Sequence, residues 1–495
     1  MLMPKPDPEI IKNKDYIVRE LKKILKNSDN VIFDNESLKA YETDGLTAYK
    51  NTPLLVVLPE NTLEVAEISK FCSKNNIKIV PRGAGTGLSG GAHPLTDGIV
   101  LGLSKFNKII EIDYMNRCVR TQPGVTNLAI TNAVKDHGFH YAPDPSSQIA
   151  CSVGGNVAEN SGGVHCLKYG VTTNNLLGLE IVTIDGKILK IGGKQMDSEG
   201  YDFLGIFTGS EGLLGIITEV IVKIIPTPES ARALLIGFDK IDEAALCVSE
   251  IIEGGVIPSG VEMMDEFAIQ AAEEFCNAGY PKVNALLIVE LDGTKIEVDY
   301  LIKSVEKIAT KRNACYIRAS KNDKERLKFW EGRKAAFPAI GRISPDYMCM
   351  DGTIPRNKLP EVLLKIKELS KKHKLRVANV FHAGDGNLHP LILYDANKPG
   401  ELDSAESFGA DILKLCVSVG GVLSGEHGIG VEKRDLMNYM FDDNDIEHQQ
   451  HLKCALDPNG LLNPGKMFPK LHRCAELGKM HVHQGKTKFP NIPRF

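Results

Sequence analysis

The chain of 495 residues carries 59 lysines and arginines against 63 aspartates and glutamates, a formal net charge of −4. This length exceeds what one hydrophobic core supports and predicts two or three domains. The ordinary composition and slightly acidic charge exclude a nucleic-acid partner. No transmembrane segment is predicted, because Thr218, Glu219 and Lys223 interrupt the apolar stretch 216–225.

The N-terminal sequence and the cysteines indicate a cytoplasmic protein. The start, MLMPKPDPEI, lacks the apolar core of a secretion signal. Eleven cysteines are scattered without a C-x-x-C pair, which is typical of reduced cytosolic thiols. Because iron–sulfur clusters need grouped thiolates, we expect none within this chain.

The first part of the chain is expected to begin with charged helices over residues 1–50, where Ile17, Leu21 and Ile24 recur at helical spacing. A strand at 53–58, a helix at 62–75 and a strand at 77–80 then predict a βαβ beginning. From 81 to 215 the chain is rich in glycine, with strands between turns.

A second pattern begins after Pro226 and Pro228, which mark a domain boundary. Strands are expected at 233–238 and 283–291, and helices up to 253 and at 296–311, 323–336, 358–373 and 402–419. This alternation predicts an antiparallel sheet covered by helices, in an α+β domain.

Three glycine-rich segments lie in the first pattern. PRGAGTGLSGG (81–91) contains G-x-G-x-x-G at Gly85, Gly87 and Gly90. A dinucleotide fingerprint needs a following helix, which Gly91 and Pro94 prevent, so the Rossmann interpretation fails. What remains is a turn whose backbone N–H groups can bind a pyrophosphate.

The other two segments are PDPSSQIACSVGGNVAENSGGVHCLKYG (143–170) and TGSEGLLGIITE (208–219). Small residues beside Asn156, Glu159 and Asn160 leave the backbone open to a flat ligand. Tight turns in a β-rich domain are the alternative explanation, which is weaker for three segments than for one.

Two later segments, HAGDGNLH (382–389) and SGEHG (424–428), supply imidazoles and carboxylates. Strands are predicted at 376–381 and 388–394. If Asp385 and Gly386 form a two-residue turn, His382 lies directly opposite His389, about 5 Å apart at Cβ. This geometry suits metal ligands. A polar turn-rich core and a metal-dependent hydrolase are the alternatives, and a hydrolase leaves the glycine segments unexplained.

These motifs together resemble a known family. RGAGTGLSGG, the 143–170 segment and GSEGLLG resemble the FAD-binding domain of the vanillyl-alcohol oxidase-type flavoproteins. HAGDGNLH, SGEHGIG and LDPNGLLNPGK are similar to the C-terminal part of its D-2-hydroxy-acid dehydrogenase branch. The tail LHRCAELGKMHVHQGK resembles that of the FAD-linked catalytic subunits of bacterial glycolate oxidases. The resemblance covers nearly the whole chain from about Thr43.

The resemblance implies an α+β fold, with a vanillyl-alcohol oxidase-type FAD-binding domain followed by a helix-covered antiparallel-sheet substrate domain. The expected divisions are an N-terminal helical segment (1–50), the FAD-binding domain (51–228), a substrate domain with the metal site (229–470) and a tail (471–495).

The resemblance also assigns cofactor residues. Some relatives tether FAD through a histidine in the first glycine segment; that position has no histidine here, so we expect noncovalent FAD. The positions that match the family's FAD-binding residues are Arg82, Gly83, Ala84, Gly85, Thr86, Gly87, Ser89, Asp144, Ser147, Gly154, Gly155, Asn156, Asn160, Gly162, Gly163, Glu211 and Ile217.

The same resemblance makes His382, His389 and Glu426 ligands of a divalent metal, zinc or another first-row ion. His427 is the implied general base, which takes the hydroxyl proton of a 2-hydroxy acid while a hydride leaves for flavin N5. Arg333 matches the arginine that holds the substrate carboxylate. A helix-surface arginine is the alternative for that residue.

Two positions bear on the substrate. Relatives that act on dicarboxylic hydroxy acids carry a threonine and a basic residue where this chain has Phe337 and Cys349. A second carboxylate therefore lacks a partner, and a small monocarboxylate such as glycolate or D-lactate fits better.

The resemblance thus implies an FAD-dependent dehydrogenase of a small 2-hydroxy acid, with the oxidation of glycolate to glyoxylate as the expected reaction. The resemblance implies partners, a second flavin-domain subunit and an iron–sulfur subunit that feed membrane quinone, and so a place at the inner face of the membrane. The alternatives are a stand-alone D-lactate dehydrogenase and an electron-transfer flavoprotein.

Overall fold

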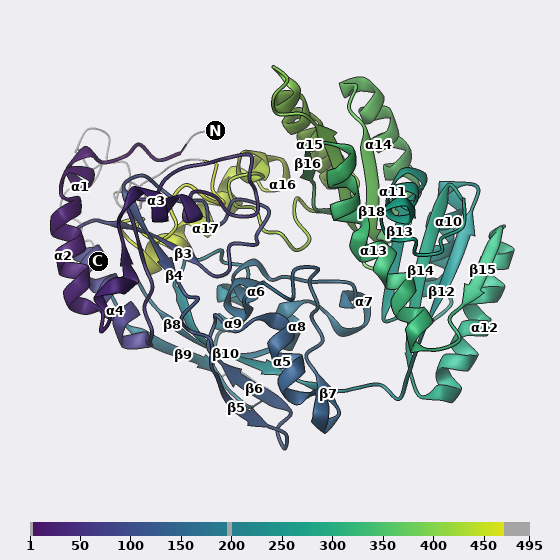
Figure 1. The fold of residues 1–495 in the computed structure, drawn as a ribbon, viewed down its shortest axis with the longest axis horizontal. Coiled ribbons are helices and arrows are strands. Elements are labelled where there is room, and N and C mark those ends of the chain that lie inside the picture. Colours follow the sequence, from purple (N-terminus) through teal and green to yellow (C-terminus); the bar gives the residue numbers. More distant parts are fainter. Residues whose placement is uncertain (1–2, 196–199, 470–495) are drawn as a thin grey trace, which may run out of the picture.

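The computed structural model describes residues 3–195 and 200–469. Two halves lie side by side: an N-terminal half, and a second half built on one large sheet (Figure 1). The predicted tail, 471–495, lies outside the described residues. In the part of the chain that is described, no helix is both long and apolar enough to cross a membrane.

The N-terminal half begins with helices, as predicted. Ile17 and Leu21 of α2 are buried, so the helical spacing marks the inner face of that helix. The bounds of the helices in this half are α1 (Pro8–Lys12), α2 (Lys14–Ile24), α3 (Asn35–Leu38), α4 (Thr62–Lys74), α5 (Asn127–Val134), α6 (Val153–Glu159), α7 (Cys166–Tyr169), α8 (Thr172–Asn175) and α9 (Phe203–Phe207).

Two sheets organise the N-terminal half. The first has the order β1-β2-β4-β3, with β2 and β3 each parallel to β4. The predicted βαβ elements are present, but β4 lies between the two strands that α4 connects. The strands are β1 (Val31–Ile32), β2 (Leu55–Val57), β3 (Lys78–Arg82) and β4 (Gly98–Gly102).

The second sheet is antiparallel, in the order β5-β6-β10-β8-β9. Its strands are β5 (Ile109–Asp113), β6 (Cys118–Thr121), β8 (Leu176–Val182), β9 (Ile188–Gly192) and β10 (Ile216–Lys223), and a separate pair joins β7 (Phe139–His140) to β11 (Ile225–Pro226).

The second half contains the predicted antiparallel sheet. Its order is β15-β12-β14-β13-β18-β19-β16, and β17 also pairs with β19. The strands are β12 (Ser230–Phe238), β13 (Gly260–Asp265), β14 (Ala285–Gly293), β15 (Tyr316–Ala319), β16 (Asp346–Cys349), β17 (Gly352–Thr353), β18 (Val377–His382) and β19 (Asn387–Tyr394).

Helices cover both faces of this sheet. Apolar residues of α10 (Ile241–Glu253), α12 (Lys295–Lys311), α14 (Leu359–His373) and α15 (Glu401–Ser418) pack on one face, and those of α11 (Glu266–Cys276) and α13 (Asp323–Ile343) pack on the other. Strand alternation divides β18 between the two cores, with Phe381 on the first face and Val380 on the second.

Helix α13 is longer than predicted. The sequence pattern places its end at residue 336, yet the helix continues through Pro338 to Ile343. Proline removes one backbone donor, and the burial of Ala339 and Ile340 in the core offsets that loss. This extension fixes the position of Phe337 beside the sheet.

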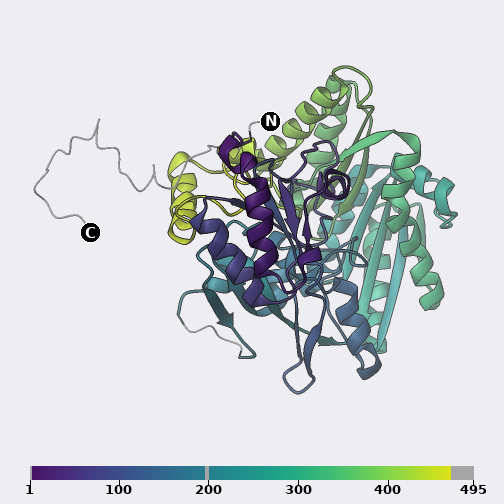
Figure 2. The ribbon, with the colours of Figure 1, turned by 60° about the vertical axis from the view of Figure 1, so that its left-hand side comes forward.

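The last described segment, which includes α17, returns to the N-terminal half (Figure 2). After α16 (Met437–Met440) and α17 (Asp443–Leu456), Leu461 and Leu462 pack in the core beneath the first sheet, and Leu462 forms a parallel bridge with Ile79. Residues that the sequence assigns to the substrate domain therefore complete the N-terminal core.

Candidate active site

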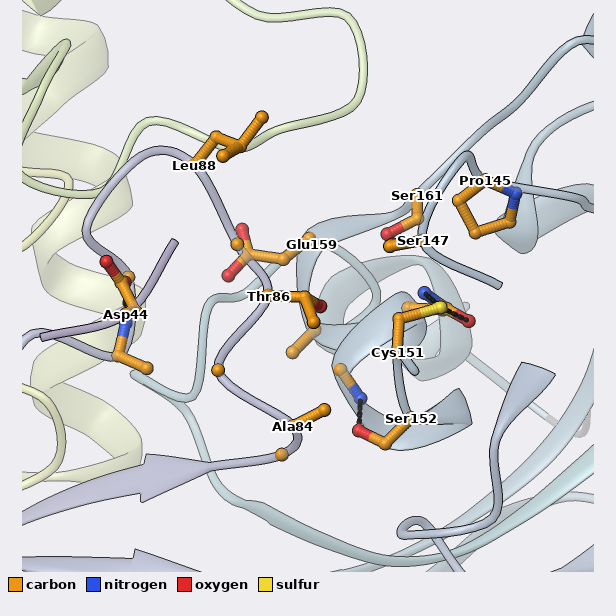
Figure 3. Close-up of a pocket in the computed structure, with 18 of the residues that line it drawn as sticks. Asp44, Ala84, Thr86, Leu88, Pro145, Ser147, Cys151, Ser152, Glu159 and Ser161 are labelled. Carbon is orange, nitrogen blue, oxygen red and sulfur yellow. Dashed lines mark hydrogen bonds between the residues drawn. The ribbon is translucent and has the colours of Figure 1, made fainter. Parts of the chain in front are cut away.

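A cavity of about 450 Å³ lies between the two halves. Residues of all three glycine-rich segments line it, together with His389, Glu426 and His427 from the second half. Figure 3 shows the part of its wall that carries Thr86, Ser152 and Glu159. The glycine segments and the histidine segments, far apart in sequence, therefore face one space.

The first glycine segment forms a turn with little side-chain cover. A Cβ atom on Gly83 would lie 2.3 Å from Ser152 Oγ, and Gly85 has a φ of +71°, so neither position accepts a larger residue without strain. Nothing lies within 4 Å of a Cβ placed on Gly87. The bare backbone at Gly87 is therefore open to a ligand, as a pyrophosphate-binding turn requires.

The structure divides the predicted cofactor residues into two groups. The residues that line the cavity are Arg82, Gly83, Ala84, Gly85, Thr86, Gly87, Ser147, Gly154, Gly155, Asn156, Glu211 and Ile217. The residues outside the cavity wall are Ser89, Asp144, Asn160, Gly162 and Gly163.

The residues outside the wall support the site from behind it. Ser89 Oγ donates to the carbonyl of His427 at 2.8 Å, and Gly162 N donates to Glu426 Oε2 at 3.1 Å. Asp144 accepts from His165, and Gly163, at a φ of +147°, packs against Asp144. Ser89 and Gly162 therefore connect the cofactor segments to the loop that carries Glu426 and His427.

The predicted hairpin at 382–389 forms, but its register differs from the prediction. His382 pairs with Asn387 and Val380 pairs with His389, so the connection spans four residues instead of two. Gly386, at a φ of +85°, takes the left-handed conformation in this loop. His382 and His389 still share one face as diagonal neighbours, with ring centroids 4.9 Å apart.

The two imidazoles converge on one carboxylate. Glu426 Oε1 lies 3.3 Å from Nε2 of His382 and 3.3 Å from Nε2 of His389. His389 Nε2 is buried and has no hydrogen-bond partner among the described residues. One nitrogen from each histidine and one carboxylate oxygen, all within 4.8 Å of one another, fit a divalent metal.

The charges of this cluster also suit a cation. Burial raises the pKa of Glu426, but a hydrogen bond from His382 and the charges of the nearby histidines outweigh it and lower the pKa to about 2. Burial lowers the pKa of His382, but Glu262 and Glu426 raise it well above 6.5. The site therefore attracts positive charge, which a metal ion would supply.

Glu262 supports the cluster from β13, and the sequence motifs do not reveal it. Its Oε1 lies 2.6 Å from His382 Nδ1, and its Oε2 accepts a hydrogen bond from Arg333 Nε at 2.6 Å. A carboxylate on the far nitrogen of a ligating histidine fixes the ring orientation and raises its basicity. Glu262 thus connects Arg333 to the cluster of His382, His389 and Glu426.

Asp351 shapes the loop that carries Glu426 and His427. Its carboxylate accepts from the backbone N–H groups of residues 425–427, from Ser424 Oγ and from Lys433 Nζ. With so many donors Asp351 is a poor metal ligand, although it lies 3.6 Å from His389 Nε2. The loop turns both Glu426 and His427 towards the cavity, as the flanking glycines predict.

His427 is placed to accept a proton. Its ring stacks on His389 with centroids 5.0 Å apart, and its Nδ1 is buried without a partner among the described residues. Burial lowers the pKa of His427 to about 4, so the imidazole is neutral at neutral pH. A neutral ring with a free nitrogen beside the cluster has the properties of a general base.

Arg333 is buried in α13 and does not lie on the helix surface. Its neighbour Lys334 lines the cavity, as do Phe337 and Pro338 of the same helix. Phe337 packs edge-on against Tyr347 at 6.3 Å, and Cys349 is buried. Helix α13 therefore contributes Lys334, Phe337 and Pro338 to the cavity wall, whereas Arg333 is not among the lining residues.

The fold and the cavity define a flavoprotein oxidoreductase, and comparison with known proteins agrees. A family model described as FAD binding domain matches residues 53–192, and one described as FAD linked oxidases, C-terminal domain, matches residues 227–467. The chain belongs to the FAD-linked oxidases, and the vanillyl-alcohol oxidase-type fold predicted from the sequence is confirmed.

Individual relatives place the chain more narrowly within this family. It is 55% identical to the glycolate oxidase subunit GlcD of Escherichia coli over 94% of this chain and 93% of that protein. It is 32% identical to a D-lactate dehydrogenase of Anaerostipes hadrus over 89% and 95% of the two chains. The solved structure of p-cresol methylhydroxylase with substrate bound, 18% identical, has the same fold with a TM-score of 0.79, covering 92% and 97% of the two chains.

Proposed function

We propose that this protein is an FAD-dependent dehydrogenase that oxidises glycolate to glyoxylate. The observation that carries the proposal is the convergence of His389, Glu426 and His427 with the glycine turn on one cavity. The similarity to a glycolate oxidase subunit supports the choice of substrate.

The first step proposed is the positioning of the substrate. A divalent metal held by His382, His389 and Glu426 would supply Lewis acidity that lowers the pKa of the substrate hydroxyl. The guanidinium of Arg333 holds the substrate carboxylate with its terminal nitrogens while Glu262 fixes its Nε. Lys334, on the cavity wall, adds a second positive charge at that end.

The second step proposed is oxidation. His427 takes the hydroxyl proton on Nδ1, and the carbon gives up its hydride. Bound FAD, noncovalently held by the glycine segments, would accept that hydride at N5. His427 Nδ1 is buried and the Glu426 side chain is 11% exposed, which limits the access of water to these atoms.

The electrons then need an acceptor outside this chain. A relative is itself a glycolate oxidase subunit, and this supports partner subunits. We propose a second flavin-domain subunit and an iron–sulfur subunit, which would bring the chain to the inner face of the cell membrane and pass electrons to quinone.

Anaerobic bleaching of the flavin by a panel of hydroxy acids tests the substrate. Glycolate should reduce the flavin with a higher kcat/KM than either lactate enantiomer. Faster reduction by D-lactate would favour a D-lactate dehydrogenase, for which the Anaerostipes hadrus relative is the precedent. No bleaching by any hydroxy acid would favour an electron-transfer flavoprotein.

A further inference from the structure

Glu159, the last residue of α6, projects into the cavity from the second glycine segment. Figure 3 shows its carboxyl group directed towards the loop that carries Thr86 and Leu88. A Cβ atom placed on Gly91 would lie 2.7 Å from Glu159 Oε1, and one on Gly428 would lie 2.1 Å from Oε2. Oε2 is buried and has no hydrogen-bond partner among the described residues.

The neighbouring Glu211 has a different environment. Its two carboxylate oxygens accept hydrogen bonds of 2.7 Å from the backbone N–H groups of Ile429 and Gly430. The backbone N–H of Glu211 donates to the carbonyl of Ala158, which holds the two acidic side chains next to each other. Burial raises the pKa of Glu211 as well, but these two backbone donors oppose the rise, whereas Glu159 Oε2 has no such donor among the described residues.

The charges around Glu159 favour its neutral form. Burial raises the pKa of Glu159 well above 4.5, and the charges of Glu211, Asp44 and Asp351 raise it further against the opposing charge of Lys433. The pyrophosphate of FAD would bring two more negative charges into the same cavity. A buried, unpaired carboxylate there would be costly, because nothing replaces its hydration.

We propose that Glu159 stays a neutral carboxylic acid in the holoenzyme and donates its proton in a hydrogen bond to the flavin end of FAD. The assignment to the flavin end rests on the proposed function, since Gly428, against which Glu159 lies, directly follows the base His427. Glu159 is then a positioning residue for the cofactor, and ionisation would replace the hydrogen bond by repulsion.

The release of FAD from the holoenzyme tests this role without any hydroxy acid. FAD release on dilution, followed by the rise in flavin fluorescence, should accelerate as the pH increases from 6 to 9, because ionisation of Glu159 removes the donor. A release rate that does not change with pH in the unmodified protein would overturn the proposal, whatever the variants do.

Three substitutions distinguish the effect of the Glu159 proton on FAD release from the effect of the side-chain shape. Glu159→Gln keeps a neutral donor, so its release rate should match the unmodified protein at pH 6 and stay constant up to pH 9. Glu159→Leu should release FAD about 5- to 10-fold faster at pH 6, as expected for a lost hydrogen bond. Glu219→Gln, at a carboxyl group on β10 that pairs with Arg120, should keep the original pH profile.

Two results would contradict the proposal. One is a Glu159→Gln protein that keeps the original pH profile, and the other is a folded Glu159→Gln protein that releases FAD as fast as Glu159→Leu. Neither result depends on glycolate oxidation. A protein that failed to oxidise glycolate would refute the proposed function and could still show the predicted pH profile of FAD release.

Discussion

Glu262 and His382 lie 2.6 Å apart on adjacent strands, with Glu262 Oε1 against Nδ1 of the ring whose Nε2 faces Glu426. Glu262 also accepts from Arg333. One buried carboxylate therefore orients a proposed metal ligand and a proposed substrate ligand together, so a change at Glu262 should affect both kinds of binding.

Replacement of Glu262 by glutamine should weaken metal binding. The amide keeps the shape but loses the charge that orients His382, and loss of such a partner typically costs 10- to 100-fold in metal affinity. Metal content after dialysis against a competing chelator measures the effect. Glu361→Gln, an exposed side chain on α14, is the control. Equal metal retention by both variants would refute the orienting role.

Substitutions of Arg333 and Lys334, two adjacent cationic residues of α13, should distinguish an effect on substrate binding alone from an effect on both substrate and metal binding. Arg333→Lys loses the planar contact with Glu262 and should raise the KM for glycolate by about 10-fold or more while also weakening metal binding. Lys334→Met should raise the KM without changing metal content, because Lys334 lines the cavity and makes no contact with Glu262 that the structure shows. Steady-state kinetics and metal analysis on both variants make the comparison.

The size of the substrate should depend on Phe337. This side chain lines the cavity beside Lys334, so Phe337→Ala should increase kcat/KM for D-lactate relative to glycolate by about 10-fold, the scale of one methyl group in an apolar pocket. Phe203→Ala, at a partly exposed residue of α9, is the control. An unchanged ratio would show that another residue limits substrate size.

The contact between the two halves should depend on pH through His165 and Glu290. Burial lowers the pKa of His165, but Asp144 and Glu290 raise it well above 6.5; burial raises the pKa of Glu290, but His165 and Arg326 lower it to about 2. The histidine's contribution to stability is complete below pH 6.5 and lost as the pH rises through its folded pKa. The contribution of the Glu290 carboxylate to stability is complete above pH 4.5 and is lost as the pH falls towards 2.

His165→Gln should therefore lower the Tm most between about pH 4.5 and 6.5, by roughly 1 °C for each kcal/mol lost in a chain of this length, with a smaller effect at alkaline pH. Thermal melts of the FAD-loaded protein measure the difference. His448→Gln, at an exposed histidine of α17, should show no such profile. A Tm difference that is constant with pH would indicate a loss of packing instead of a lost ion pair.

The sequence predicts the antiparallel sheet and the glycine turns that line the cavity, because strand alternation and turn residues are local signals. It assigns Leu461 and Leu462 to the substrate domain, whereas the structure packs them in the N-terminal core. It does not predict the hairpin register, since the four-residue loop is set by Gly384, whose backbone N–H donates to the carbonyl of Val261 on the neighbouring strand. It also misses Glu262 and Asp351, which lie 120 and 75 residues from His382 and Glu426. Such partners are determined by strand pairing and carry no motif of their own.

The rate of anaerobic flavin reduction by glycolate, measured before and after metal removal, most directly tests the proposed metal site and the proposed base His427. The proposal predicts that chelation slows reduction, that added divalent metal restores it, and that His427→Gln slows it by about 100-fold or more with metal still bound. An unchanged reduction rate in the metal-free protein would contradict the metal clamp formed by His382, His389 and Glu426.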